Sequence, residues 1–189
     1  MRSESDSERP GARRRLETYR LVLDPLEPRH APEMFQALRD ESLYRFIPQD
    51  PPGSEIALQE RYERLAAGRS PDGTEIWLNW AAREATTGAV VGTLQATVRA
   101  NHTADIAYII FGHAQRRGFA FGGAAAVIAH LREDHEIVSV VADIDTRNSA
   151  SIALIERLGF TRVRTTRDAD SFKGATSDEY RYERVLGRG

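Results

Sequence analysis

The stretch 137–160, IVSVVADIDTRNSASIALIERLGF, decides the fold of this chain. Its first part, 137–144, is almost entirely apolar, as expected of a strand that is buried on both faces. Asn148 then stands where a helix N-cap belongs, apolar residues recur at helical spacing over 152–158, and Gly159 suits a left-handed C-terminal cap. The stretch therefore predicts a buried strand followed by a short helix.

The rest of the chain alternates between strand and helix patterns. Four earlier segments have strand patterns: 18–25, 75–82, 89–98 and 104–111. Three have apolar residues at helical spacing: 32–39, 54–68 and 119–131. After Gly159, we expect strands over 160–164 and 178–186, joined by a polar loop over 165–177. The expected fold class is therefore α/β, of the mixed α+β type, with about seven strands and about four helices.

Length and composition bound the domain organisation. The chain has 189 residues without an internal repeat, and its 41% hydrophobic content can supply one real core. Residues 1–16 mix Ser, Pro, Gly and both signs of charge, so we expect a disordered N-terminal tail there. Residues 17–189 are expected to form a single domain.

Charge and residue types exclude several classes of function. Lys and Arg total 26 against 28 Asp and Glu, and a net charge of −2 argues against a nucleic-acid partner. The absence of cysteine excludes disulfides and a Cys nucleophile, and the five scattered His residues show no metal-ligand spacing, so we expect no metal. No segment resembles a secretory signal or a membrane span, so a cytoplasmic location without a membrane partner is expected.

The junction over 104–131 predicts an anion site. An apolar strand is followed by a polar loop and then by an Ala-rich helix, with QRRGFA at 115–120 where the helix begins. Backbone N–H groups at a helix N-terminus suit a pyrophosphate, and Gly118 with the small Ala120 lets phosphates approach the backbone. Taken alone, the same pattern is also ordinary turn chemistry.

Two motifs in a fixed order make the signal specific. The pattern Q/R-x-x-G-x-G/A matches Gln115, Gly118 and Ala120. The pattern N-x-x-S-x-x-L-x-x-x-L-G-F matches Asn148, Ser151, Leu154, Leu158, Gly159 and Phe160. With both motifs, residues 18–187 resemble the Gcn5-related N-acetyltransferase (GNAT) superfamily, in particular its RimJ/RimL-like branch of ribosomal-protein N-terminal acetyltransferases.

This resemblance implies the GNAT fold, a mostly antiparallel mixed sheet in which the strands at 104–111 and 137–144 are parallel neighbours that splay apart. Acetyl-CoA, the implied donor, would enter the gap between them. Its pantetheine would pair with backbone at Ile109, Ile110 and Phe111, and would contact Asn148. Its pyrophosphate would rest on Gln115, Arg116, Arg117, Gly118, Phe119 and Ala120.

The resemblance also assigns catalytic roles. Asp105 aligns with a carboxylate that takes the proton of the attacking amine, and because Asp is short we expect a water relay. Many GNAT enzymes have a Tyr donor where this chain has Ile155, so Ser151 is the candidate hydrogen-bond donor to the departing sulfur. His102 and Glu75 are alternative bases.

Two further expectations concern the backbone and the phosphates. An N–H of the first cleft strand, around Ile110, would bind the carbonyl oxygen of the acetyl group. Phe121 stands where relatives often have Thr or Ser, so one phosphate contact is expected to be missing. Arg116 and Arg117 could compensate for it, or could simply be solvated.

The expected function is an acetyl-CoA-dependent N-acetyltransferase in which a primary amine attacks directly within a ternary complex. The resemblance favours a protein or peptide N-terminal amine; a small-molecule amine or antibiotic, and a non-catalytic acyl-CoA-binding protein, are the alternatives. A cationic antibiotic would favour an acidic acceptor mouth, and the same acids could instead be solvated helix faces: Glu41, Asp50, Glu55 and Glu60. The sequence leaves a homodimer open.

Overall fold

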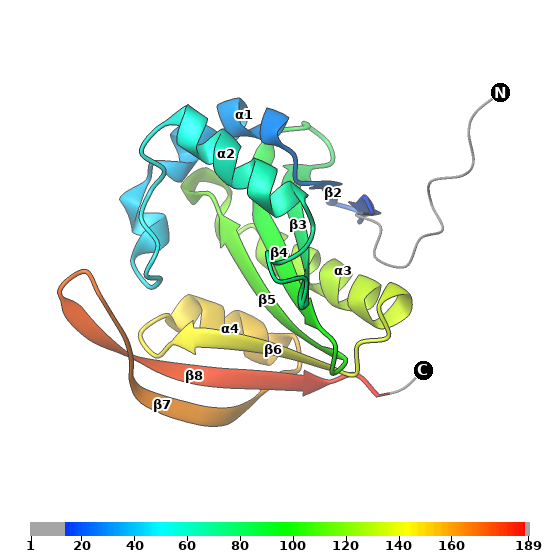
Figure 1. The fold of residues 1–189 in the computed structure, drawn as a ribbon, viewed down its shortest axis with the longest axis vertical. Helices are drawn as coiled ribbons and strands as arrows, with labels where there is room; N and C mark the ends of the chain where they lie inside the picture. Colours follow the sequence, from blue (N-terminus) through cyan, green and yellow to red (C-terminus); the bar gives the residue numbers. More distant parts are fainter. Residues whose placement is uncertain (1–13, 188–189) are drawn as a thin grey trace.

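The computed structural model describes residues 14–187, and one eight-stranded sheet forms its centre (Figure 1). The order of strands is β1-β2-β3-β4-β5-β6-β8-β7, and all neighbours are antiparallel except β5 and β6. The strands are β1 (Leu16–Glu17), β2 (Leu21–Pro25), β3 (Glu75–Glu84), β4 (Val90–Arg99), β5 (Thr103–Ile110), β6 (Ser139–Asp145), β7 (Thr161–Phe172) and β8 (Ala175–Val185). The predicted mixed α/β class is confirmed.

Four α-helices cover the two faces of the sheet. They are α1 (Ala31–Leu38), α2 (Glu55–Ala66), α3 (Phe119–Asp134) and α4 (Ser149–Arg157). Because strand side chains alternate between faces, two apolar clusters form. One cluster packs the sheet against α3 and α4, and the other packs it against α1 and α2. We call these sides the α3 face and the α2 face. None of these helices has an apolar run long enough to cross a membrane.

The parallel strands β5 and β6 part after three residue pairs. The last pair joins Asp105 to Val141, although β5 continues to Ile110 and β6 to Asp145. Figure 1 shows the two strands meeting at one end and diverging toward the other. The predicted splayed pair is confirmed, and we call the opening between the two backbones beyond Asp105 and Val141 the β5–β6 cleft.

The polar loop predicted over 165–177 is wrong. These residues extend β7 and β8 into a long hairpin that turns at Lys173 and Gly174, whose φ angles are 52° and 75°. Most of β7 is exposed, so its residues alternate between two solvated faces and give no hydrophobic period. The hydrophobic pattern of the sequence therefore does not predict that these residues pair as strands.

The predicted tail is wrong for residues 14–16. Leu16 belongs to β1 and packs into the α3-face cluster, and the carbonyl oxygen of Arg14 accepts a 2.9 Å hydrogen bond from Trp80 Nε1. A single buried leucine was too weak a signal within a charged segment. The remainder of the predicted tail, residues 1–13, lies outside the described residues.

Candidate active site

The two faces of β5 lead to different surroundings. The side chains of Ala107 and Ile109 line a pocket beneath α2. Those of Tyr108 and Ile110 pack into the cluster on the α3 face. The two faces of β5 therefore border different parts of the molecule, the pocket under α2 on one side and the α3-face cluster on the other.

Backbone hydrogen bonds fix which residues of β5 address the cleft. The N–H of Phe111 donates to the Val91 carbonyl oxygen at 2.9 Å and so points toward β4, and its carbonyl oxygen accepts from the Ala114 N–H at 2.8 Å. In an antiparallel pair the direction of the backbone groups alternates, so those of Ile109 also point toward β4 while those of Tyr108 and Ile110 turn toward β6. The expectation that Ile109 and Phe111 offer backbone groups to the cleft is therefore wrong. Ile110 does face it, together with Tyr108.

Gly92 in β4 leaves room for the Ile109 carbonyl oxygen of β5 to approach closely. It lies opposite Ile110, and a Cβ atom added to it would overlap the Ile109 carbonyl oxygen and stand 3.0 Å from the Ile110 Cα atom. The C=O of Ile109 and the N–H of Ile110 belong to one trans peptide and point in opposite directions. The carbonyl directed at Gly92 thus turns the Ile110 N–H into the cleft.

The loop that follows β5 presents backbone donors at the N-terminus of α3. Gly118 is the N-cap with φ 83°, and Arg116 is also left-handed with φ 59°. The first N–H groups of a helix have no intrahelical partner, and left-handed residues turn successive N–H groups into an anion-binding concavity. The loop therefore presents backbone donors of the kind that bind anions.

Most side chains of this loop have other partners. Gln115 donates through Nε2 to the Ile110 carbonyl oxygen at 3.0 Å, and Phe119 is buried in the α3-face core. Arg117 forms an ion pair with Glu84, whereas Arg116 is exposed. Gln115 and Phe119 thus shape the loop, and the backbone carries its capacity to bind an anion.

Two arginines that the sequence reading missed lie beside this loop. Arg20 donates to the Arg117 carbonyl oxygen at 2.6 Å and stacks on Phe119, 4.8 Å from the ring centroid. Arg157, from the last turn of α4, stacks 4.6 Å from the centroid of Phe121. Both come from distant segments, so no local motif marks them. Arg157 brings a cation to the side chain that replaces the expected hydroxyl.

The N-terminus of α4 borders the cleft on the α3 face. The Asn148 side chain caps the helix by accepting from the Ser151 N–H at 3.1 Å, so its amide nitrogen remains available. Ser151 neighbours Tyr108, whose buried hydroxyl makes no hydrogen bond of normal geometry with the described residues. Burial raises the pKa of Tyr108, and Ser151 offsets part of that rise. The sequence reading missed this tyrosine.

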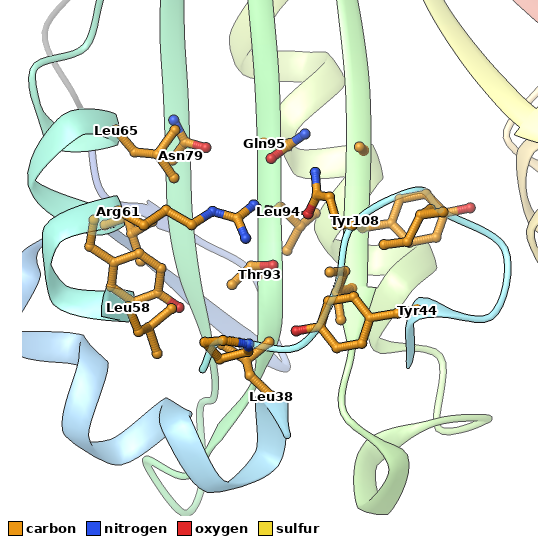
Figure 2. Close-up of a pocket in the computed structure, with 17 residues that line it drawn as sticks. Leu38, Tyr44, Leu58, Arg61, Leu65, Asn79, Thr93, Leu94, Gln95 and Tyr108 are labelled. Carbon is orange, nitrogen blue, oxygen red and sulfur yellow. Dashed lines mark hydrogen bonds between the residues drawn. The ribbon is translucent and has the colours of Figure 1, made fainter. Parts of the chain in front are cut away.

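The pocket on the α2 face has a volume of about 120 Å³ and lies between α2, the 44–52 segment and strands β3 to β5 (Figure 2). Leucine, isoleucine and tyrosine side chains form most of its walls, and Arg61 is the one charged residue among those that line it. The acids considered for an acidic mouth do not line it and are exposed: Glu41, Asp50, Glu55 and Glu60. In the described structure they are solvated side chains.

Asp105 lies on the α2 face where the two strands part. It forms ion pairs with Arg99 and with Arg181, the latter at 3.3 Å between Oδ1 and Nη2. Two guanidinium groups therefore engage the predicted base. Of the alternatives, Glu75 pairs with Arg99 at 3.3 Å, and His102 is exposed in the turn before β5, at the closed end of the cleft.

The tip of the β7–β8 hairpin closes one side of the site. Lys173 Nζ donates to the carbonyl oxygens of Tyr44, Ile47 and Gln49 at 2.7, 2.9 and 3.0 Å. This contact, which we call the Lys173 latch, ties the C-terminal hairpin to the segment between α1 and α2. Tyr44, Ile47 and Gln49 line the pocket, so the latch holds its outer wall in place.

Comparison with known proteins identifies the family to which this fold is similar. The chain matches the family described as acetyltransferase (GNAT) domain over residues 20–161. No curated protein matches it in sequence.

Similar solved structures include acetyltransferases from three bacteria. One, from Salmonella typhimurium, is described as modifying the N-terminal serine of a 50S ribosomal subunit protein; it is 19% identical, with a TM-score of 0.80 over 92% of this chain and 100% of that one. A GNAT-family acetyltransferase from Bacillus anthracis is 16% identical, with a TM-score of 0.78 over 91% and 98%. A Gcn5-related N-acetyltransferase from Brucella melitensis is 17% identical, with a TM-score of 0.79 over 94% and 80%.

At these identities the structural likeness concerns the fold. The sequence match covers most of the chain. It includes the splayed strands β5 and β6, the loop that leads into α3, and helix α4 with its Asn148 cap. The chain therefore belongs to the GNAT family of acetyltransferases.

Proposed function

We propose that this protein transfers the acetyl group of acetyl-CoA directly to the primary amine of an acceptor, which is a protein or peptide N-terminal amine. The observation that carries the proposal is the parting of β5 and β6, because the β5 edge beside it has the pocket on its α2 face and Tyr108 next to Ser151 on its α3 face. An acceptor entering from one face would meet a thioester held from the other.

The residues around the cleft fit acetyl-CoA. Tyr108 and Ile110 offer backbone groups along its edge, the left-handed Gly118 opens the loop to phosphate, and Arg20 and Arg157 add positive charge beside it. The buried Tyr108 hydroxyl has an unused hydrogen bond at the cleft, which a ligand could satisfy. When bound, acetyl-CoA supplies the acetyl group as an activated thioester.

Each step of the transfer has a candidate residue. The Ile110 N–H would hold the carbonyl oxygen as negative charge develops on it. Ser151 would donate to the sulfur, and Tyr108 beside it would support that donation; its raised pKa keeps the hydroxyl protonated at neutral pH.

Asp105 remains the proposed acceptor of the amine's proton, reached through water, because it lies on the α2 face where the strands part. Glu179 on β8 is the competing carboxylate. Burial and then the charge of Asp143 raise the pKa of Glu179, which favours proton uptake closer to neutral pH.

A small-molecule amine is the second candidate, because the pocket is small. Its volume of about 120 Å³ suits a residue-sized group and is well below that of a typical drug-sized site. A pocket whose one charged lining residue is an arginine does not suit a polycationic antibiotic.

The first experiment measures donor binding and acceptor identity together. Thermal unfolding with acetyl-CoA should show stabilisation of about 2.7 kcal/mol at a hundredfold excess over Kd. Mass spectrometry of peptides and amines incubated with enzyme and acetyl-CoA should then identify the acetylated class. Absence of a thermal shift at millimolar acetyl-CoA contradicts the donor assignment. A shift without acetylation of any amine supports a non-catalytic acyl-CoA-binding protein.

The second experiment separates the two candidate bases. Asp105→Asn and Glu179→Gln each remove a carboxylate at nearly constant size. The variant that lacks the base should lose kcat/KM most at pH 6 to 7 and recover toward pH 10, where free amine exists without help. The other variant should keep the wild-type profile. If both keep it, neither carboxylate is the base.

A further inference from the structure

Arg61 stands out in the pocket on the α2 face because its charge has no counterpart. Its guanidinium donates to Gln49 Oε1 at 2.9 Å, and no carboxylate of residues 14–187 lies within ion-pair distance of it. A guanidinium has five N–H donors in a planar fork, so most of them remain available. Figure 2 shows the side chain reaching from α2 across the sheet face toward Thr93 and Gln95.

Uncharged polar side chains extend this site. Asn79 on β3 and Gln95 on β4 are directly paired positions, and both line the pocket. Neither side-chain amide makes a hydrogen bond with the described residues; Asn79 is 7% exposed, whereas Gln95 is open to solvent. A largely apolar pocket with a few convergent polar groups is the usual form of a small-ligand site.

The distribution of charge on the α2 face indicates how an acceptor would be oriented in the pocket. Asp143 on β6 and Glu179 on β8 lie across the cleft from the pocket, and Asp105 lies on β5 at the closed end of the cleft, whereas Arg61 lies under α2. An acceptor whose amine approaches the cleft would therefore present its other end to the guanidinium. A carboxylate matches the planar fork through two parallel hydrogen bonds.

We propose that Arg61 selects acceptors that carry a carboxylate near the amine to be acetylated. This inference rests on the acetyltransferase function proposed above and specifies its substrate class. The carboxylate has two sources: the α-carboxylate of a free amino acid, or an acidic side chain next to a peptide N-terminus.

The test uses matched acceptor pairs that differ only in this charge. L-Alanine and L-alaninamide, with β-alanine and its amide, probe the free amino acid; Ser-Asp-Ala-amide and Ser-Asn-Ala-amide probe the peptide. In at least one pair, kcat/KM of the wild-type enzyme should be about tenfold higher for the acid, mainly through KM. The pair that shows the preference identifies the source.

Variants assign the preference to Arg61. Arg61→Gln should reduce the acid-to-amide ratio to about one, and Arg61→Lys should keep part of it because the charge remains without the fork. Arg64→Gln, one turn along α2 outside this pocket, should keep the wild-type ratio. Acetyl-CoA affinity should be unchanged in all three.

Several outcomes would overturn the proposal while leaving the acetyltransferase function intact: amides accepted as well as acids, or a preference that survives in Arg61→Gln. If none of these probes is acetylated, calorimetry of N-acetyl-alanine with the CoA-loaded protein decides. Binding to wild type that is about tenfold weaker in Arg61→Gln supports the proposal, and equal or absent binding overturns it. Failure of acetyl-CoA itself to bind would instead contradict the proposed function.

Discussion

The two sides of the cleft are built differently. The side that would hold the donor consists mainly of backbone: the N–H of Ile110, the left-handed loop at Gly118 and the N-terminus of α3. The side that would receive the acceptor consists of long side chains from distant segments, with Arg61 on α2 and Lys173 on the hairpin tip. If the protein has the proposed function, chain geometry would fix the recognition of the donor, whereas single side chains could change the recognition of the acceptor.

The largest effect should follow from a methyl group at Gly92. Gly92→Ala would place Cβ on the Ile109 carbonyl oxygen and push the cleft edge of β5 away. We expect the free energy of unfolding to fall by about 3 kcal/mol, with loss of acetyl-CoA binding. Chemical denaturation and calorimetry measure the two effects.

Gly53→Ala is the matched control, because nothing lies within 4 Å of its added Cβ. Its stability should stay within about 0.5 kcal/mol of wild type. If the stability of Gly92→Ala also stays within this range, the backbone of β5 can move away from the added methyl group. The proposal that backbone geometry fixes the donor side would then be wrong.

The second effect concerns side chains on the donor side. Ser151→Ala should lower kcat by about 100-fold or less, with little change in acetyl-CoA affinity. Tyr108→Phe should lower kcat with little change in stability, because the buried hydroxyl makes no hydrogen bond of normal geometry with the described residues. If the two hydroxyls act on the same sulfur, their effects in the double variant should not be additive. An unimpaired Ser151→Ala would mean that the thiolate departs without this donor.

The third effect tests the loop at Gly118, which is proposed to bind the pyrophosphate of acetyl-CoA. Gly118→Val places a branched side chain at φ 83°, and we expect acetyl-CoA to bind about tenfold more weakly while the fold persists. Gly73→Val introduces similar backbone strain at φ 73°, with nothing within 4 Å of its Cβ. It should cost comparable stability and leave the affinity unchanged. Equal affinities in both variants would move the phosphate site elsewhere.

The smallest effect concerns the acceptor side. Lys173→Met removes the three hydrogen bonds of the Lys173 latch, so the wall formed by Tyr44, Ile47 and Gln49 should loosen. We expect KM for the acceptor to rise about threefold, stability to fall by about 1 kcal/mol, and acetyl-CoA affinity to stay the same. Hydrogen exchange should increase in the 44–49 segment. A change in acetyl-CoA affinity instead would show that the two sides are not independent.

The same division decides what the sequence could predict. The apolar strand at 137–144 and the cap at Asn148 are local features, so this part of the fold followed from the pattern, whereas the contacts with acetyl-CoA came from the family resemblance and stay predictions. The sequence could not predict which residues of β5 point their backbone groups toward the cleft, because this is shown by the hydrogen bond from Phe111 to Val91 on the neighbouring strand. Arg61 and Tyr108 were missed because their importance depends on the elements that surround them.

Lys173 has a further consequence for a protein that handles an activated acyl group. It is the only lysine in the chain, and its ammonium is bound by three carbonyl oxygens. An ammonium must lose its proton before it can attack a thioester, and this one would also have to abandon those acceptors. The remaining basic side chains that titrate above neutral pH are guanidinium groups, which stay charged and unreactive. The chain therefore has no free lysine amine that could attack the thioester, and we expect little acetylation of its own side chains during turnover.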